Sequence, residues 1–535
     1  IGQTINPNYP LISTDFQVQD LDIKSETFYK HYNQSEDLLF TRVSLTNKGD
    51  KALKFSIILA IRPYNPEGLA PISDIVYMTN NAFIVNNRLG LLLDKKPDNV
   101  ICLNHDDGDI LNFYGKWEMI FQTKCPMHQA SALAEYQLTI PPGETQTITA
   151  KLPIETPASL KKVFQKTLNP KQKKGLQKRI NTLQTISLEN ELDKCKRDWK
   201  ALRKSTTKFT FSNPKTQAFI DQTISHIFGL QGQTQLVSGS FTYNTASFLS
   251  SIMTARLWTE LNEFHFARTL LNTLLADACR SLKKPFPQTS LENASLLLQG
   301  IYDYLRITQD FDWVEKRLSN IDQLEKIILA HPIKKSVQTR ALKSLLLKNI
   351  QTKSLYLDNA DIQNLLWAST GLESHIHIRI LLEKPSKSAK PKQLLALLQD
   401  KLSNKLDAVN QQSQALKETH SELSNTYISS LIGCYPMTAI SPKHPSIQRY
   451  LQSISPNLLS STILYSFSGH SGISPTQNFH LAQLYIQNDP DKASSILTEL
   501  MSLATETGCW PETIHPVSHG GMVGDGQYTL AHVES

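Results

Sequence analysis

The sequence predicts a β-sandwich followed by an all-helical domain, and three observations support this fold class. From Asp37 to Glu155, apolar and polar residues alternate with period two between turn signals, which is typical of strands. After about Asn213 the alternation gives way to leucine-rich stretches with apolar residues at i, i+3, i+4 and i+7, which is typical of helices. A chain of 535 residues is also too long for one core, so several domains are expected.

Three β-hairpins are predicted in the first region, each with alternating strands on either side of turn residues. Their turns lie at residues 47–50, at Asn86 and Asn87, and at residues 141–143. Hairpins that follow one another without intervening helices indicate packed sheets. Residues 1–158 are therefore predicted to form the β-sandwich domain.

Residues 159–212 are predicted to be a lysine-rich helical linker. Their basic runs, such as KQKKGLQKR, have no interleaved aromatics, which favours a solvated helical surface over a nucleic-acid surface. Residues 213–535 hold consecutive helices joined by loops, which pack as antiparallel pairs in bundles, solenoids or closed toroids. The candidate helices cover residues 215–230, 247–263, 265–282, 291–308, 313–330, 335–347, 360–382, 392–402, 423–432, 445–454, 476–487 and 490–507.

Composition excludes several classes of protein. With 40% hydrophobic and 19% charged residues the chain reads as globular, and no stretch approaches the ~20 apolar residues of a membrane span. The 6 cysteines form no CxxC pair and favour reduced thiols in the cytoplasm, although the first residue is Ile1, which leaves room for an upstream signal peptide. Because no His or carboxylate cluster has metal-ligand spacing, no metal or other cofactor is expected.

The segment GCWPETIHPVSHGGMVGDGQYTLAHVES at the C-terminal end is unusually rich in glycine, aromatic and carboxylate residues. It is predicted to be a long loop between a helix that ends near Thr507 and another that begins near Gln527, and such loops carry binding function. The plainer interpretation is a glycine-rich turn with Asp525 as a helix N-cap. The last helix would have only about two turns, so the chain is expected to be a fragment.

Four segments carry a resemblance to a known family. They are RPYNPEG at 62–68, SGSFTYN at 238–244, YLDNADIQNLLW at 356–367 and WPETIHPVSHGGMVGDG at 510–526. In this order they resemble motifs of the six-hairpin glycosidases, in which an N-terminal supersandwich precedes an (α/α)6 toroid. The resemblance implies that residues 213–535 form the toroid, truncated in its last helix, and that the substrate is a carbohydrate.

The resemblance also implies a pair of carboxyl groups. Glycoside hydrolysis needs one carboxyl group to protonate the leaving oxygen and another to activate water or attack carbon, and a separation of ~6.5 to 9.5 Å suits an inverting reaction. Glu512 is the candidate base, at the position that the base usually takes in the family. Asp358 is the candidate acid and Asp361 its nearest rival. For either aspartate the alternative is an ordinary helix cap or first-turn acid.

Five residues are implied as substrate contacts. Trp510 and Tyr243 offer flat faces on which sugar rings pack, although a buried aromatic at the base of a loop is the alternative. Glu292 is placed to hydrogen-bond a sugar hydroxyl. His515 and Asp525 complete the set, with a supporting or solvent-facing role as the alternative for the histidine.

One departure from the family pattern divides the functional hypotheses. Relatives continue TY-x-x-F-W-x-RD-x-A, where the Arg-Asp pair grips the sugar, whereas this chain has Leu249 and Ser250 there. The leading hypothesis is a glycoside hydrolase-like protein acting on an oligo- or polysaccharide. The alternative is a catalytically degenerate carbohydrate-binding or scaffold protein, and a glycan phosphorylase ranks third because no glycine-rich phosphate loop is present. The sequence sets neither the sugar nor the oligomeric state.

Overall fold

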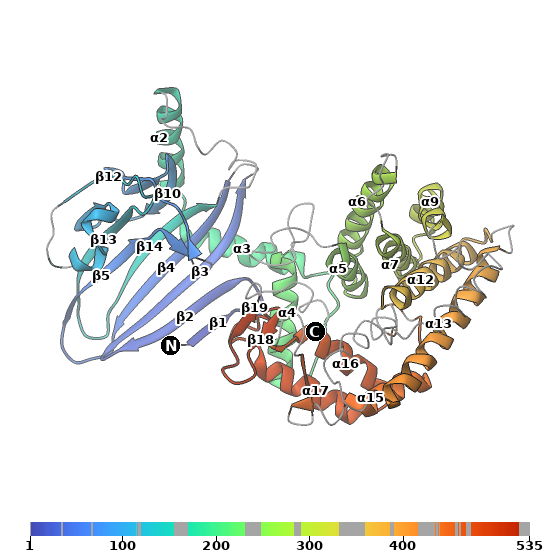
Figure 1. Cartoon of the computed structure of the whole chain (residues 1–535). Helices are drawn as coiled ribbons and strands as arrows, with labels where there is room; N and C mark the ends of the chain where they lie inside the picture. The colour runs from blue at the N-terminus through green and yellow to red at the C-terminus, as the bar shows by residue number, and fades with distance from the viewer. Residues whose placement is uncertain are drawn as a thin grey trace. The chain divides into compact units, whose positions relative to one another are not determined.

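The computed structural model describes residues 2–33, 36–65, 68–113, 115, 119–154, 170–230, 248–282, 290–330, 359–385, 390–415, 434, 437, 439–454, 458–459, 462–466 and 472–523. The chain divides into two compact units, Ile1–Lys204 and Ser205–Ser535 (Figure 1). The predicted helices at 335–347, at 423–432 and from Gln527 lie outside the described residues. In the parts that are described, no helix combines the length and apolarity needed to cross a bilayer.

The first unit is built from antiparallel strands. Their bounds are β1 Gly2–Ile5, β2 Leu11–Val18, β3 Leu21–Asn33, β4 Glu36–Asn47, β5 Leu53–Ile61, β6 Tyr64–Asn65, β7 Gly68–Leu69, β8 Asp74–Met78, β9 Ala82–Val85, β10 Arg88–Leu93, β11 Asn99–Leu103, β12 Gln122–Lys124, β13 Ser131–Ile140 and β14 Thr145–Ile154. The large sheet has the order β1-β2-β3-β4-β14-β10-β9-β8-β12, and the small sheet has the order β11-β13-β5. The sequence did not predict β1 to β3, which precede Asp37.

The two sheets pack face to face around one apolar core. Leu45, Ile75 and Phe83 of the large sheet share a cluster of buried side chains with Ala132 and Tyr136 of the small sheet. Because successive strand residues point to opposite faces, the alternation in the sequence supplies one apolar row per strand to this core. The predicted β-sandwich is confirmed.

The predicted hairpin around Asn86 and Asn87 is also confirmed. Strands β9 and β10 pair antiparallel across these residues. Both asparagines adopt the left-handed conformation, with φ of 50° and 62°. Asparagine tolerates this conformation better than other non-glycine residues, and two such residues in succession are typical of a tight hairpin turn.

The other two predicted hairpins are wrong. Strand β4 pairs in the large sheet and β5 in the small one, and β13 and β14 are divided in the same way. The turns at 47–50 and 141–143 therefore carry the chain from one sheet to the other.

Asn47 holds these two crossing turns together. Its side chain is fully buried, and its Nδ2 donates to the carbonyls of Lys51 at 2.7 Å and Ile140 at 2.9 Å. The backbone N of Gly143 donates to the Asn47 carbonyl at 2.9 Å. A buried amide with these partners satisfies backbone groups that a sheet-to-sheet crossing leaves unpaired.

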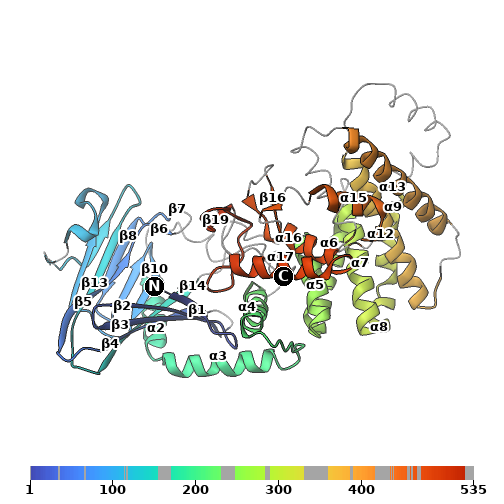
Figure 2. The same cartoon turned by 90° about the horizontal axis from the view of Figure 1, so that it is seen from below.

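Two helices cover the outer face of the large sheet. They are α2, Pro170–Gln184, and α3, Leu188–Leu202, and both count within the first unit. Ile180 and Leu192 pack with Phe28, Phe40 and Leu92 of the sheet, and Figure 2 shows α3 running along the strands. The lysine-rich segment thus buries an apolar stripe on the sheet, while the predicted limits at residues 158 and 212 stay predictions.

The second unit is mainly helical. Its helices are α4 Pro214–Leu230, α5 Phe248–Glu260, α6 Phe264–Leu282, α7 Leu291–Thr308, α8 Phe311–Glu315, α9 Leu318–Ala330, α12 Asn359–Leu381, α13 Lys390–Ala415, α15 Pro445–Ile454, α16 Pro475–Ile486 and α17 Pro490–Leu503. Helix α6 contacts α5 and α7, and α9 contacts α7 and α12. The predicted helix at 313–330 is divided into α8 and α9.

Helices α5 and α7 run parallel. They meet at Gly300, where a methyl group would stand 3.2 Å from Ile252 Cγ2. About one turn further along both helices, Arg256 Nε and Asp303 Oδ2 form an ion pair of 2.7 Å. Because the residue numbers rise together from one contact to the next, the N-terminal ends of the two helices lie at the same end of the unit.

Helices α7 and α12 are parallel for the same reason. A methyl group on Gly371 would stand 2.8 Å from Ser295 Cα, and the rings of Tyr302 and His377 are 5.2 Å apart. Such close approach explains why position 371 is a glycine. The three helices α5, α7 and α12 therefore begin at one common end.

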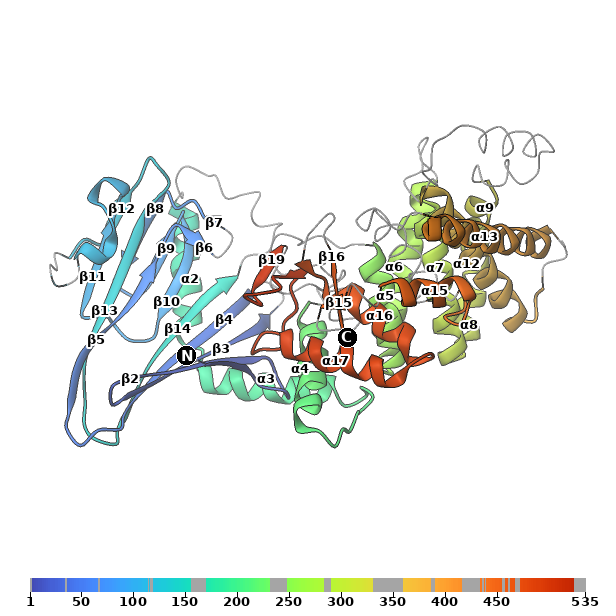
Figure 3. The same cartoon turned by 60° about the horizontal axis from the view of Figure 1, so that its bottom comes forward.

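The last part of the second unit returns to its first helix. Trp510 packs edge-on against Phe219 of α4 at 5.8 Å and against Phe479 of α16 at 5.4 Å, between ring centroids. The imidazole Nε2 of His226 on α4 lies 2.7 Å from the carbonyl oxygen of Thr507. Figure 3 shows α16, α17 and the strands near them beside α4. These contacts close the helices into a ring, as a toroid requires and an open coil does not.

A small antiparallel sheet in the second unit was not predicted. Its strands are β15 Leu458–Leu459, β16 Ile463–Ser466, β17 Gly472–Ile473, β18 Thr513–Ile514 and β19 Gly521–Val523, in this spatial order. Part of the segment predicted as one long loop after Thr507 is thus a β-hairpin. Strands of two to four residues are too short for a period of two to be visible in the sequence.

Candidate functional site

The site begins with a turn that follows α17. The backbone N of Gly508 donates to the carbonyl of Thr505 at 2.8 Å. Gly508 has φ of +72°, a conformation that favours glycine, and a Cβ there would stand 3.2 Å from Gln222 Cβ. This turn directs the next residues into the closure of the ring, where Trp510 is fully buried.

Glu512 follows directly and is held between buried neighbours. Pro511 before it is buried, Thr513 after it is 3% exposed, and Glu512 itself is partly exposed. Two residues on, Ile514 pairs with Ile473, just before the N-terminus of α16. The predicted base is therefore a partly buried carboxylate in a well-fixed backbone beside a helix N-terminus.

His515 organises the turn after β18. Its Nδ1 accepts from the backbone N of Val517 at 3.2 Å and of Ser518 at 3.1 Å, and its own N donates to the Gly520 carbonyl at 2.8 Å. These bonds account for one ring nitrogen. The predicted contact of His515 with a substrate stays a prediction, and Asp525 lies outside the described residues.

Glu292 lies in the first turn of α7, which Ser290 caps by accepting from the N of Asn293 at 3.1 Å. Its side chain is partly exposed, and burial raises the pKa of its carboxyl above the ordinary value. Asp361 lies in the first turn of α12, whereas Asp358 and Tyr243 fall outside the described residues. Gly371 of α12 lies beside Ser295 of α7. Asp361 precedes Gly371 by more residues than Glu292 precedes Ser295, so at 1.5 Å per residue its backbone lies about 10 Å further toward the common end of the helices.

Leu249 and Ser250 lie in the first turn of α5, at the same end as the starts of α7 and α12. Ser250 is 1% exposed and its carbonyl accepts from Thr254 Oγ1 at 2.7 Å. The first turn of α5 thus lies at the same end of the unit as the first turns of α7 and α12.

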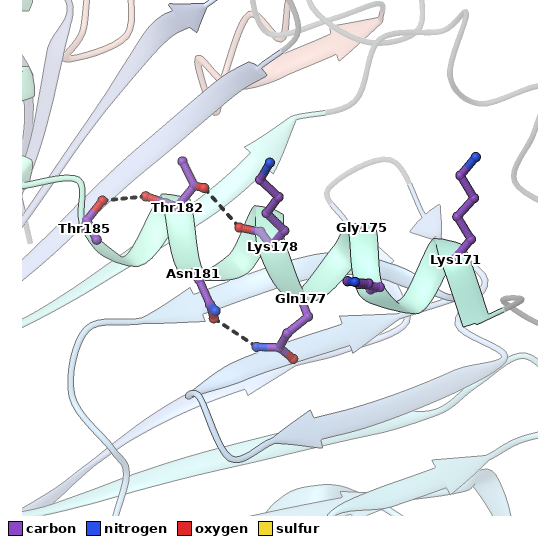
Figure 4. Close-up of a pocket in the computed structure, with 8 residues that line it drawn as sticks. Lys171, Gly175, Gln177, Lys178, Asn181, Thr182 and Thr185 are labelled. Atoms are coloured by element: carbon purple, nitrogen blue, oxygen red, sulfur yellow. Dashed lines mark hydrogen bonds between the residues drawn. The ribbon is translucent and has the colours of Figure 1, made fainter.

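The surface hollow in Figure 4 is not a second candidate. It runs along α2 and is lined by Lys171, Lys174, Gly175, Gln177, Lys178, Asn181, Thr182 and Thr185. All of these residues belong to α2 except Thr185, which directly follows it, and their bonds, such as Gln177 Nε2 to Asn181 Oδ1 at 2.9 Å, run along that helix. An open helix face without opposing groups does not enclose a ligand. In the described part of the chain, no three His, Cys, Asp or Glu side chains are grouped to hold a metal ion.

Sequence reasoning missed one pair of chemically active side chains beside the site. Cys509 Sγ lies 3.5 Å from Nε2 of His226, which is 6% exposed on α4. The two residues are 283 positions apart, so no local pattern connects them. The only signal was the position of Cys509 immediately before the Trp-Pro-Glu motif.

The pKa of Glu292 leads to a pH-dependent prediction. Its folded pKa lies above its unfolded pKa, so the folded chain keeps a proton that the unfolded chain has lost. The free energy of unfolding therefore falls as pH rises from about 4 to 7, and Glu292→Gln removes this contribution. We expect the variant to gain stability over the native chain across that range, measured as the urea midpoint followed by tryptophan fluorescence. Glu383→Gln, at an exposed position, is the control, and its urea midpoint should differ from that of the native chain by the same amount at every pH. A constant difference for Glu292→Gln as well would contradict the prediction.

Solved structures of carbohydrate-acting enzymes are similar to this chain in fold. The chain is similar to the crystal structure of a bacterial glucoamylase complexed with acarbose, with 9% identity and a TM-score of 0.60, over 100% of this chain and 84% of that one. A rhamnosidase from Klebsiella oxytoca with rhamnose bound matches with 10% identity and a TM-score of 0.42, over 100% of this chain and 98% of that one. No protein-family model and no curated protein matches the sequence. The likeness to the glucoamylase confirms the predicted fold, a β-sandwich followed by an (α/α)6 toroid.

Proposed function

We propose that the chain is a glycoside hydrolase-like protein that cleaves a glycosidic bond in an oligo- or polysaccharide. The observation that carries this proposal is the placement of Glu512. Its carboxylate is partly exposed in a backbone that buried Trp510 and Pro511 fix at the closure of the helical ring. The likeness of the fold to that of a bacterial glucoamylase complexed with acarbose supports a carbohydrate substrate.

In this proposal Glu512 takes a proton from the attacking water. Asp358, or its rival Asp361, gives a proton to the leaving oxygen, and water attacks the anomeric carbon from the opposite face, which inverts its configuration. The parallel run of α5, α7 and α12 supports the assignment, because it brings the starts of these helices, Asp361 and Glu292 included, to one end of the ring. Glu512 lies beside the start of α16. The proposal predicts that Glu512 and the acid lie at the same rim.

A non-catalytic carbohydrate-binding protein is the second candidate, and one observation favours it. The first turn of α5 presents Leu249 and a buried Ser250 where relatives carry Arg and Asp. Neither residue supplies the paired, charge-assisted hydrogen bonds that hold a sugar at the cleavage point.

A panel of chromogenic glycosides and oligosaccharides, incubated with the whole chain with and without phosphate, tests the proposal. We expect release of product with at least one member of the panel, independent of phosphate. Product that forms only with phosphate would identify a phosphorylase instead. Thermal stabilisation by a sugar without any release of product would support the binding protein and overturn the hydrolase.

A further inference from the structure

A cysteine and a histidine meet beneath the candidate site. The imidazole Nε2 of His226 lies 2.7 Å from the carbonyl oxygen of Thr507 and 3.5 Å from Cys509 Sγ. A carbonyl only accepts, so Nε2 carries a hydrogen that it donates to Thr507. The sulfur also lies 3.9 Å from Nδ1, so it stands beside the imidazole ring. The hydroxyl of Thr507 lies 3.5 Å from the same sulfur and is placed to donate to it.

The Thr507 hydroxyl and the adjacent imidazole together favour the thiolate form of this sulfur. Burial by itself raises the pKa of Cys509, but the contact and charge of His226 and the hydrogen bonds of Thr507 and Thr505 together outweigh burial, and the pKa is lowered. For His226, burial lowers the pKa, but the contact and charge of Cys509 and the bond to the Thr507 carbonyl together outweigh burial, and the pKa is raised. A thiolate beside an imidazolium is the usual arrangement of a reactive cysteine.

Three other cysteines provide an internal comparison. Burial raises the pKa of Cys102 and Cys434 to about 12 and that of Cys195 to about 11. Cys509 is the one cysteine of the 6 that is not fully buried. Cys509 is therefore distinguished from these cysteines by its histidine neighbour and by its partial exposure.

We propose that Cys509 is a covalent modification site, a nucleophilic thiolate that His226 supports and that reacts with hydroperoxides and small alkylating agents. With a hydroperoxide, a bond forms between sulfur and one peroxide oxygen as the O–O bond breaks. Sulfur is oxidised by two electrons to a sulfenic acid, and the second oxygen leaves as it takes up a proton from the His226 imidazolium. With iodoacetamide, the S–C bond forms as the C–I bond breaks, and iodide leaves.

Modification at this position has a consequence for the neighbouring site. Cys509 is bonded into the turn through its N, which donates to Thr505 Oγ1 at 2.8 Å, and it directly precedes Trp510. A group added to the sulfur must displace part of this turn, on which the position of Glu512 depends. Loss of turnover after oxidation rests on the proposed function, whereas the reactivity of the thiol does not.

Alkylation of the whole folded chain tests the proposal. The chain is treated with iodoacetamide at neutral pH, and the rate at each cysteine is followed by peptide mass spectrometry. We expect Cys509 to react at least about tenfold faster than any other cysteine, since one pKa unit is a tenfold change in thiolate fraction. After hydrogen peroxide, a sulfenic-acid trapping reagent should label the same peptide.

Variants of His226 and Thr507 test which neighbour makes Cys509 reactive. His226→Gln keeps a donor for the Thr507 carbonyl but has no imidazolium, and should slow alkylation of Cys509 about tenfold. Thr507→Val should slow it less, and His265→Gln, an exposed histidine on α6, should leave it unchanged. Thermal melting shows whether each variant is folded. If His226→Gln does not fold, the native pH profile decides, with half-maximal alkylation expected below the ordinary thiol pKa of about 8.5. Reaction at Cys509 no faster than at the buried cysteines, or unaffected by folded His226→Gln, would overturn the proposal.

Discussion

The variant Glu512→Gln is expected to lose nearly all turnover on a substrate that the native chain hydrolyses, while it still binds that substrate. Glutamine has the shape of glutamate, so the backbone between Trp510 and β18 should not move. Its amide does not accept the proton of the attacking water, and removal of a general base typically costs about 10²- to 10⁴-fold in rate. The measurement is kcat on the hydrolysed glycoside together with the affinity for an unreactive analogue.

Glu506→Gln is the matched control for this experiment. Glu506 is an exposed carboxylate in the same connection after α17, so its replacement makes the same change of charge in the same loop. We expect kcat within about twofold of the native value, since exposed substitutions away from a site have small effects. A Glu512→Gln variant that keeps the native kcat would remove Glu512 as the base, and equal losses in both variants would indicate a general effect of charge.

The bounds of several helices could be predicted because their signals are local. Helix α7 spans the residues predicted for it, with Ser290 as its N-cap and Gln309 in the left-handed conformation at its C-terminal end. Helix α15 also matches its prediction, between Pro445 and Ile454. In both, the apolar period and the terminal residue lie within one short stretch of sequence, and no distant contact is needed to decide the outcome.

The partners of the strands could not be predicted in the same way. Each crossing turn, at 47–50 and 141–143, has the turn residues of a hairpin and alternating strands on both sides. At each turn the two flanking strands belong to different sheets. This arrangement is stabilised by the hydrogen bonds of Asn47 with Ile140 and Gly143, nearly 100 residues away. A local pattern specifies a turn and a strand, but tertiary packing decides which sheet receives the strand.

The candidate site shows the same division. Trp510 and Glu512 were found because they stand together in one motif, and the structure places both at the closure of the ring. The partners of Trp510 are Phe219 of α4 and Phe479 of α16, and each has an ordinary helical sequence context. For Asp361 the structure gives only the position of its backbone, in the first turn of α12. Its role as the acid stays a prediction.

Trp510→Ala is expected to have the largest effect on stability. The indole is fully buried and contacts two aromatic rings on different helices, Phe219 on α4 and Phe479 on α16. Truncation of a buried tryptophan to alanine costs about 3–5 kcal/mol, because the transfer free energy of the ring is lost and a cavity remains. That is a large part of the stability of an ordinary domain, about 5–15 kcal/mol.

Urea denaturation measures this loss, with far-ultraviolet circular dichroism as the probe because the substitution itself removes a fluorophore. Trp510→Phe keeps an aromatic ring between the two partners and should lose less. Val517→Ala is the matched control in the following hairpin, where the side chain is 83% exposed, and should change the free energy of unfolding by no more than about 0.5 kcal/mol. Because Trp510 joins α4 to α16, the alanine variant should also be cleaved faster by protease at the start and end of the helical unit. Native stability in Trp510→Ala would mean that the ring is closed by other contacts, and that Glu512 is positioned without the tryptophan.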